Sequence, residues 1–77
     1  MSNCQLDHNR EDVIKKFESQ KEFLPEEMVP LFQLYFSKEH TQKILNEMFH
    51  LLKKYDLSSI DEKARRDKQI LLLLKNL

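Results

Sequence analysis

The feature that most constrains this 77-residue chain is the absence of glycine. At the usual frequency of ~7%, a chain of this length would carry roughly five glycines. Glycine supplies the positive-φ positions of tight hairpins and the close backbone approach that phosphate-binding loops require. The sequence therefore excludes the dinucleotide-binding fingerprint, the P-loop, the nucleophile elbow and the EF-hand loop. It predicts helices that are joined by short polar connections.

Length and composition predict one folded domain. Hydrophobic residues make up 40% of the chain and charged residues 34%, a balance typical of a globular helical protein rather than a disordered one. A chain of this size buries only about 60–65% of its unfolded surface, so we expect its stability to be marginal. Five phenylalanines and two tyrosines supply aromatic mass for the core.

The first predicted helix follows a polar N-terminal segment. Residues 1–8 show no apolar periodicity, and we expect them to form a flexible tail. Asn9 is a favourable N-cap, and Val13 and Phe17 lie four residues apart on one helical face. These patterns predict a helix over about residues 9–22.

The second predicted helix has apolar residues on almost every face. Pro25 followed by two glutamates is typical of a helix start, because the first turn leaves its amide groups without intrahelical partners. Pro30, one turn later, either bends this helix or begins it again. A helix that is apolar all round is normally buried. We therefore expect residues 25–36 to form the central element.

The third and fourth predicted helices have clear start signals. Ser37 is a candidate N-cap for a helix over residues 38–55. Ser59 and Glu62 have the spacing of a capping box, which predicts a helix over residues 59–76. The third helix carries the most regular amphipathic stripe of the chain, which consists of Ile44, Leu45, Met48, Leu51, Leu52 and Tyr55.

These segments predict an all-α fold in which residues 9–77 form one helical domain. The short connections favour a small three- or four-helix bundle with mostly antiparallel neighbouring helices. The single cysteine, Cys4, cannot form the disulfides of a secreted scaffold. The longest apolar run, over residues 70–74, is far shorter than the ~18 residues needed to span a bilayer. We therefore expect a cytoplasmic protein with no membrane segment.

The leucine-rich C-terminus is the most unusual local pattern. In a small bundle, the rest of the chain can cover only one side of a terminal helix. Contiguous apolar surface that stays exposed usually marks an interaction site. Each leucine left in water forfeits ~1.5–3 kcal/mol of burial. These leucines either pack into the domain's own core or bind a partner. The candidate partner-binding residues, which include aromatic residues of the third helix, are Phe49, Tyr55, Leu71, Leu72, Leu74 and Leu77.

The charge balance argues against nucleic-acid binding. Thirteen basic and thirteen acidic residues give a formal net charge of zero, whereas neutralising phosphates requires a basic excess. A basic cluster on the fourth helix supports an alternative, a helix-turn-helix-like DNA-binding transcription regulator. Asp61 and Glu62 at the start of that helix would repel phosphate, so the sequence favours a protein partner. The residues of the alternative are Lys63, Arg65, Arg66 and Lys68.

No pattern of catalytic or metal-ligating residues stands out. Glu47 and His50 have the spacing found in di-iron bundles, but such a site needs further glutamates from facing helices. Cys4 lacks the paired CxxC spacing of a structural zinc site. A short chain without glycine loops leaves little room for a preorganised pocket. We expect no enzymatic activity, no cofactor, no metal and no small-molecule substrate.

These observations favour a small regulatory module that binds a partner protein through an apolar helical surface. Near-neutral charge gives little repulsion between copies, so a homodimer is the expected form if the partner is a second copy. The abundance of apolar residues in a short chain also supports another alternative, a subunit that folds only within a larger assembly.

Overall fold

The computed structural model describes residues 8–75, which form four α-helices and three short 3₁₀ turns. The predicted all-α fold is confirmed. Residues 1–7 of the tail predicted over residues 1–8 lie outside the described residues, whereas His8 is not part of a free tail, because its amide bonds to Asn46 and its ring stacks on Phe49. In chain order, the elements are α1 (Arg10–Gln20), η1 (Lys21–Phe23), η2 (Glu26–Met28), α2 (Val29–Phe36), α3 (Gln42–Leu52), η3 (Tyr55–Leu57) and α4 (Ile60–Lys75).

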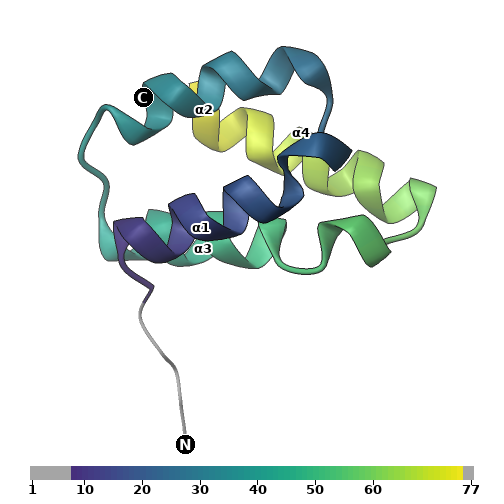
Figure 1. The fold of residues 1–77 in the computed structure, drawn as a ribbon, viewed down its shortest axis with the longest axis horizontal. Helices are drawn as coiled ribbons and strands as arrows, with labels where there is room; N and C mark the ends of the chain where they lie inside the picture. The colour runs from purple at the N-terminus through teal and green to yellow at the C-terminus, as the bar shows by residue number, and fades with distance from the viewer. Residues whose placement is uncertain (1–7, 76–77) are drawn as a thin grey trace, which may run out of the picture.

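Helices that follow one another in the chain run in opposite directions, as predicted, but α1 and α3 run in the same direction (Figure 1). The α1 helix packs against α3, and α4 packs against both α3 and α2. Two hydrogen bonds fix the parallel pair. Gln42 Nε2 donates to the His8 carbonyl oxygen (2.6 Å) at one end, and the Asp56 amide donates to Gln20 Oε1 (2.8 Å) at the other.

This arrangement brings three turns to one end of the molecule. Because α1 and α3 are parallel, η1 and η2, which follow α1, lie at the same end as η3, which follows α3 (right-hand end in Figure 1). We call this the connector end, and it consists of residues 21–28 and 53–60.

The start of α1 is built as the sequence predicts. Asn9 Oδ1 accepts a hydrogen bond from the Asp12 amide (2.8 Å), and Asp12 Oδ2 accepts one from the Asn9 amide (3.3 Å). This capping box satisfies two amides that the first helical turn leaves unpaired. The α-helix ends at Gln20, two residues before the predicted end, where the chain tightens into η1.

The position of Pro30 resolves the alternatives for the second predicted helix. Residues 26–28 form a 3₁₀ turn, and α2 begins at Val29 with Pro30 in its first turn. The missing amide of proline is tolerated there because the first amides of a helix have no intrahelical acceptor. Pro30 therefore begins a new α-helix rather than bending a continuous one.

The predicted start of the third helix at Ser37 is wrong. Ser37 lies at the end of α2, where its hydroxyl donates to the Leu34 carbonyl oxygen (2.6 Å). Thr41 is the N-cap of α3, and its hydroxyl accepts from the Ile44 amide (3.3 Å). The end of α2 and the start of α3 lie at the same left-hand end of Figure 1, the first at the top and the second at the bottom. Residues 38–41 join the two helices in a non-helical conformation.

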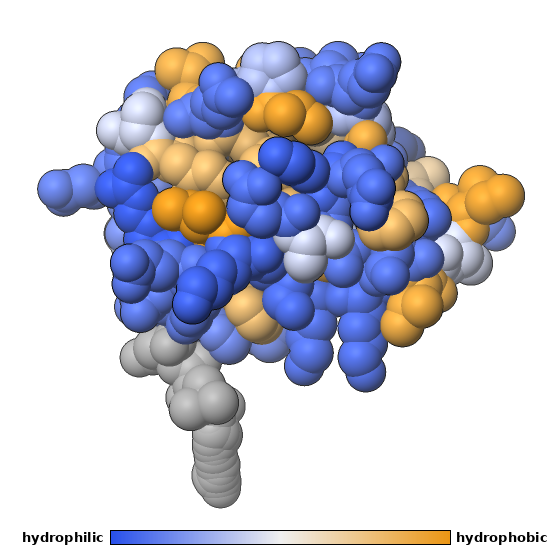
Figure 2. All heavy atoms as spheres, in the orientation of Figure 1, coloured by the Kyte–Doolittle hydropathy of each residue, from blue (hydrophilic) through white to orange (hydrophobic). Residues whose placement is uncertain are grey.

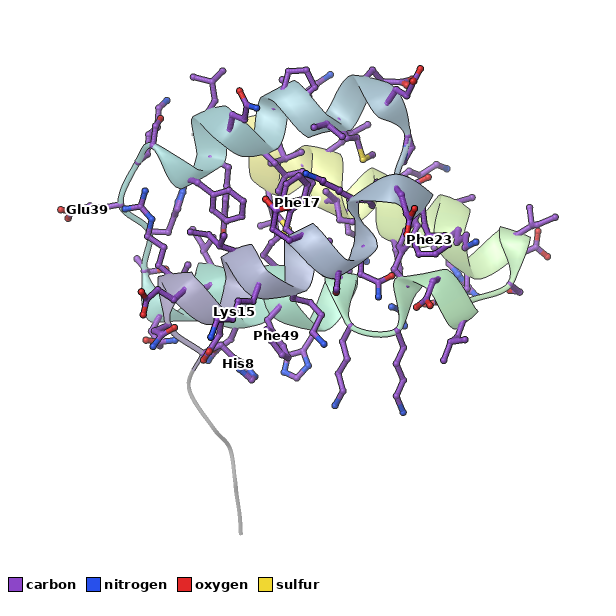
Figure 3. The ribbon with its side chains drawn as sticks, viewed as in Figure 1. His8, Lys15, Phe17, Phe23, Glu39 and Phe49 are labelled. Atoms are coloured by element: carbon purple, nitrogen blue, oxygen red, sulfur yellow. The ribbon has the colours of Figure 1, made fainter. Side chains whose placement is uncertain are left out.

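Aromatic rings hold α1 and α2 together in the core. Phe17 lies between these helices (Figure 3), and its ring stacks on that of Phe32 with centroids 4.5 Å apart. The ring of Phe36 meets Phe17 edge-on at 5.6 Å. Such pairs contribute ~0.5–1.5 kcal/mol beyond the area that they bury. The buried core comprises Val13, Phe17, Leu24, Met28, Phe32, Tyr35, Met48, Leu52, Tyr55, Ile70 and Leu74.

The absence of glycine has a local cost at the end of α3. Lys54 adopts the left-handed conformation, with φ 57° and ψ 26°. Glycine is the usual residue at such positions because a Cβ atom clashes with the backbone there, at a cost of roughly 1–2 kcal/mol. The turn from α3 into η3 therefore stores strain in a lysine.

We predict that Lys54→Gly raises the free energy of unfolding by about 0.5–1 kcal/mol, because relief of the left-handed strain exceeds the entropy that glycine adds to the unfolded chain. Urea unfolding followed by circular dichroism at 222 nm measures the change. Lys53→Gly is the matched control, because Lys53 has an extended backbone without strain (φ −61°, ψ 124°). Glycine at this position should lower the free energy of unfolding. Equal destabilisation by both substitutions would contradict the strain argument.

Candidate interaction surface

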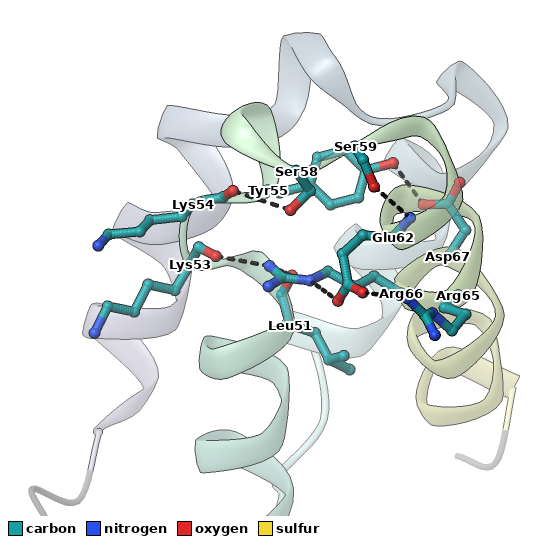
Figure 4. Close-up of polar contacts among 10 residues, drawn as sticks. All are labelled: Leu51, Lys53, Lys54, Tyr55, Ser58, Ser59, Glu62, Arg65, Arg66 and Asp67. Carbon is teal, nitrogen blue, oxygen red and sulfur yellow. Dashed lines mark hydrogen bonds and ion pairs between the residues drawn. The ribbon is translucent and has the colours of Figure 1, made fainter.

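Arg66 joins α4 to the end of α3. Its Nη1 atom donates to the carbonyl oxygens of Lys53 (2.7 Å) and Leu51 (3.3 Å), and its Nε atom donates to Glu62 Oε2 (2.9 Å) (Figure 4). The last carbonyls of a helix have no intrahelical donors and carry its negative dipole end. The Arg66 guanidinium group donates hydrogen bonds to these carbonyls and places a positive charge beside the negative end of the dipole. Arg66 therefore fixes the end of α3 against α4.

Tyr55 forms the second contact of this junction. Its ring is buried, and its hydroxyl donates to Asp67 Oδ1 at 2.6 Å (Figure 4). Burial, followed by the hydrogen bond and the negative charge of Asp67, raises the pKa of Tyr55 well above its usual range. The structure therefore places Tyr55 in the core, and it does not belong to a surface that a partner could contact.

The predicted capping box at the start of α4 is only half formed. The Glu62 amide donates to the Ser59 hydroxyl (3.1 Å), as expected. The Glu62 carboxylate instead accepts from Arg66 and from Arg65 Nη2 (3.0 Å). The hydrogen bond from Arg66 is the main cause that lowers the pKa of Glu62, and the positive charges of both arginines add to it. This carboxylate serves the junction of α3 and α4 rather than the helix cap.

The basic residues of α4 do not all face solvent: two of them contact the end of α3 or Tyr55, and two are exposed. Arg66 is engaged by the end of α3, and the Lys63 ammonium lies 5.7 Å from the centre of the Tyr55 ring. Arg65 and Lys68 are exposed. The four residues named for DNA binding therefore do not form one continuous row that could follow a phosphate backbone.

The C-terminal leucines also divide between core and surface. Leu74 is buried with Ile70, four residues away on the same helical face, whereas Leu72 lies on the opposite face and is 61% exposed. Leu71 is half-buried against the core, and Leu77 lies outside the described residues. Of the leucines that the sequence singled out, the structure leaves Leu72 as the exposed one among residues 8–75.

Phe49 is covered in part by the start of α1. The His8 ring stacks on it with centroids 3.6 Å apart and an interplanar angle of 9° (both labelled in Figure 3). The Lys16 ammonium lies 5.4 Å from the centre of the same ring. The His8 amide also donates to Asn46 Oδ1 (2.9 Å). Phe49 therefore anchors the N-terminal side of α1 to α3, a role that sequence periodicity did not indicate.

The two most exposed large apolar side chains lie elsewhere, at the connector end. Ile60 is 86% exposed and Leu57 76%, and Phe23 is exposed to a smaller extent (45%), below Leu72. Figure 2 shows apolar residues protruding where η3 leads into α4, and Figure 3 places Phe23 at the same end. The hydrogen bond from the Asp56 amide to Gln20 holds the end of α1, which η1 follows, beside η3. We call Phe23, Leu57 and Ile60 the connector surface.

Sequence analysis missed the connector surface because its residues belong to no periodic stripe. Leu57 and Ile60 flank the two serines that start α4, and Phe23 immediately precedes the buried Leu24. The signal that could have revealed Leu57 and Ile60 is their position: large apolar residues at a helix start, out of phase with the core face of either adjoining helix.

Acidic residues accompany each member of the connector surface. Glu22 precedes Phe23, Asp56 precedes Leu57, and Asp61 follows Ile60. Of the nearby basic residues, Lys21 is paired with Glu18 at 2.9 Å. The side chains of Lys53 and Lys54 extend away from the start of α4 (Figure 4). We call Glu22, Asp56 and Asp61 the acidic rim of the connector surface; the exposed Lys21, Lys53 and Lys54 lie at the same end of the molecule.

Two hollows are lined by residues that the structure describes. Within residues 8–75, no three potential metal ligands of the His, Cys, Asp or Glu type gather in one place. None of the helices in that range is long and apolar enough to cross a membrane. One hollow of about 220 Å³ is lined by Arg10, Phe36, Lys38, Glu39, His40 and Leu45, and another of about 400 Å³ by His50, Leu51, Glu62, Arg65, Arg66 and Gln69.

Comparison with protein-family models, with curated proteins and with solved structures finds no match to this chain.

We predict that Arg66→Ala lowers the free energy of unfolding by about 1–3 kcal/mol, because it leaves the last carbonyls of α3 without their donor and removes the partly buried stem of the arginine. Arg65→Ala is the matched control, since Arg65 is exposed and pairs with the same glutamate. Its effect should stay within about 0.5 kcal/mol. Urea unfolding of both variants measures the difference, and equal losses would refute the structural role of Arg66.

Proposed function

We propose that this protein is a small non-enzymatic regulatory module that binds another polypeptide through the connector surface. The observation that carries this proposal is that the two most exposed large apolar side chains of residues 8–75, Ile60 and Leu57, protrude from the same end of a bundle whose core is complete without them. Large apolar side chains that are left exposed on a folded domain mark candidate interaction sites.

Folding of the chain itself does not require these side chains. Ser59 caps α4 through its hydroxyl, so an isoleucine at the next position contributes nothing to that cap. Burial of each such side chain by a partner would contribute ~1.5–3 kcal/mol. The exposed positions of Leu57 and Ile60 therefore suit association with a partner better than they suit the stability of the isolated domain.

The junction of α3 and α4 supports this function by holding the connector end in place. In the sequence, Leu57 and Ile60 lie between two anchored residues. Tyr55 is bonded to Asp67, and Arg66 is bonded to the carbonyls at the end of α3. A surface that is already ordered pays less conformational entropy when it binds. The mechanism that we propose is therefore occlusion or bridging of a partner by a preformed surface, without chemistry.

We further propose that this association takes place in the cytoplasm. The chain contains a single cysteine, which suits a compartment that keeps thiols reduced.

The proposal predicts a partner whose capture requires the connector surface. The chain would serve as bait in a lysate of its source cells, as wild type, as Leu57→Glu/Ile60→Glu and as Leu34→Glu. Leu34 is the matched control because it is 57% exposed on α2, outside the connector surface. We expect the double variant to lose at least about tenfold of a protein that the other two baits retain. Circular dichroism checks that each bait is folded, and identical capture by all three would contradict the proposal.

A further inference from the structure

A second exposed surface, on α4, has the opposite charge to the connector surface. Arg65, Lys68, Leu72 and Lys75 follow a 3-4-3 spacing, which places them on one helical face. All four side chains are exposed, and they lie on the face of α4 opposite the buried Ile70 and Leu74. We call these four residues the α4 stripe. It combines an apolar centre, Leu72, with a basic rim.

The apolar centres of the two surfaces cannot bury each other within one molecule. Leu72 follows Ile60 by twelve residues of the same helix. At 1.5 Å per residue, roughly 18 Å of rigid helix separates them. Burial of Leu72 against Ile60 must therefore join two molecules.

We propose that the connector surface of one copy binds the α4 stripe of a second copy. This inference depends on the proposed function, since it names the polypeptide that the connector surface takes. The apolar centres, Leu72 on one side and Leu57 with Ile60 on the other, bury each other. The acidic rim of Glu22, Asp56 and Asp61 faces the basic rim of the α4 stripe.

Charge complementarity favours a second copy as the occupant. Thirteen basic and thirteen acidic residues cancel over the whole chain, so no net repulsion opposes contact between copies. Acids adjoin each member of the connector surface in the sequence, and bases flank Leu72 on the α4 stripe; the two sets approach each other at Asp61 and Arg65, one helical turn apart. Complementary rims of this kind steer association and fix its register.

The contact joins two different surfaces, so the assembly is head-to-tail. Each copy keeps one connector surface and one α4 stripe unused after a single contact, and association continues until a ring closes or an open chain forms. This differs from the homodimer that the sequence predicts for self-association, because a head-to-tail contact need not stop at two copies.

The test is sedimentation equilibrium from low micromolar to millimolar concentration, with variants that reverse one rim at a time. Glu22→Lys/Asp61→Lys reverses the connector rim, and Lys68→Glu/Lys75→Glu reverses the α4 stripe. We expect the wild type to self-associate and each variant alone to weaken association by about tenfold or more. An equimolar mixture should restore association, because each variant supplies the native surface that the other lacks.

Two controls keep the result interpretable. Leu34→Glu should associate as the wild type does, while Leu72→Glu should not, and circular dichroism confirms that each variant is folded. Association should also weaken as salt rises, because exposed charges are screened.

A wild-type chain that stays monomeric at every concentration would overturn this inference, as would association that neither rim reversal changes. If the monomeric chain still captured a lysate protein through Leu57 and Ile60, the proposed function would stand and the second copy would be rejected as its partner. If neither self-association nor such capture occurred, both proposals would fail.

Discussion

The hydrogen bonds from Arg66 to the carbonyls at the end of α3 determine how α4 packs against α3. A helix commonly ends with a left-handed glycine, which lets the following backbone satisfy those carbonyls. This chain has no glycine, and an arginine of the next helix supplies the donors instead. Lys54 takes the left-handed position in glycine's place. The turn from α3 to α4 is therefore defined by side chains as much as by backbone geometry.

The junction also explains which residues are left for partners. It draws Arg66, Glu62, Asp67 and Tyr55 into contacts within the chain, so residues that look like a basic surface or an aromatic anchor in the sequence serve the fold. Leu57 and Ile60 lie within the same stretch but make no part of this network, and they face solvent. Parallel packing of α1 on α3 then brings Phe23 to the same end (Figure 3).

The sequence predicted the helices better than the surface, for a physical reason. Local signals determine where Asn9 starts α1 and where Ser59 starts α4, because a cap contacts residues only three positions away. Ser37 and Thr41 are both suitable caps, and only the path from α2 to α3 decides between them. Exposure of Leu57 and burial of Tyr55 depend on contacts with α1 and α4 across the bundle. Periodicity within one helix carries no information about those contacts.

In this account the connector end is an ordered surface. Native-state hydrogen exchange, measured residue by residue, tests this most directly. The amide of Asp56 donates to Gln20, that of Leu57 to the Lys54 carbonyl, and that of Ser58 to the Tyr55 carbonyl. We predict that these three amides exchange as slowly as amides inside α3, because opening them requires the junction to separate. Exchange at the rate of an unstructured peptide would show that Leu57 and Ile60 belong to a loose loop, and would contradict the account.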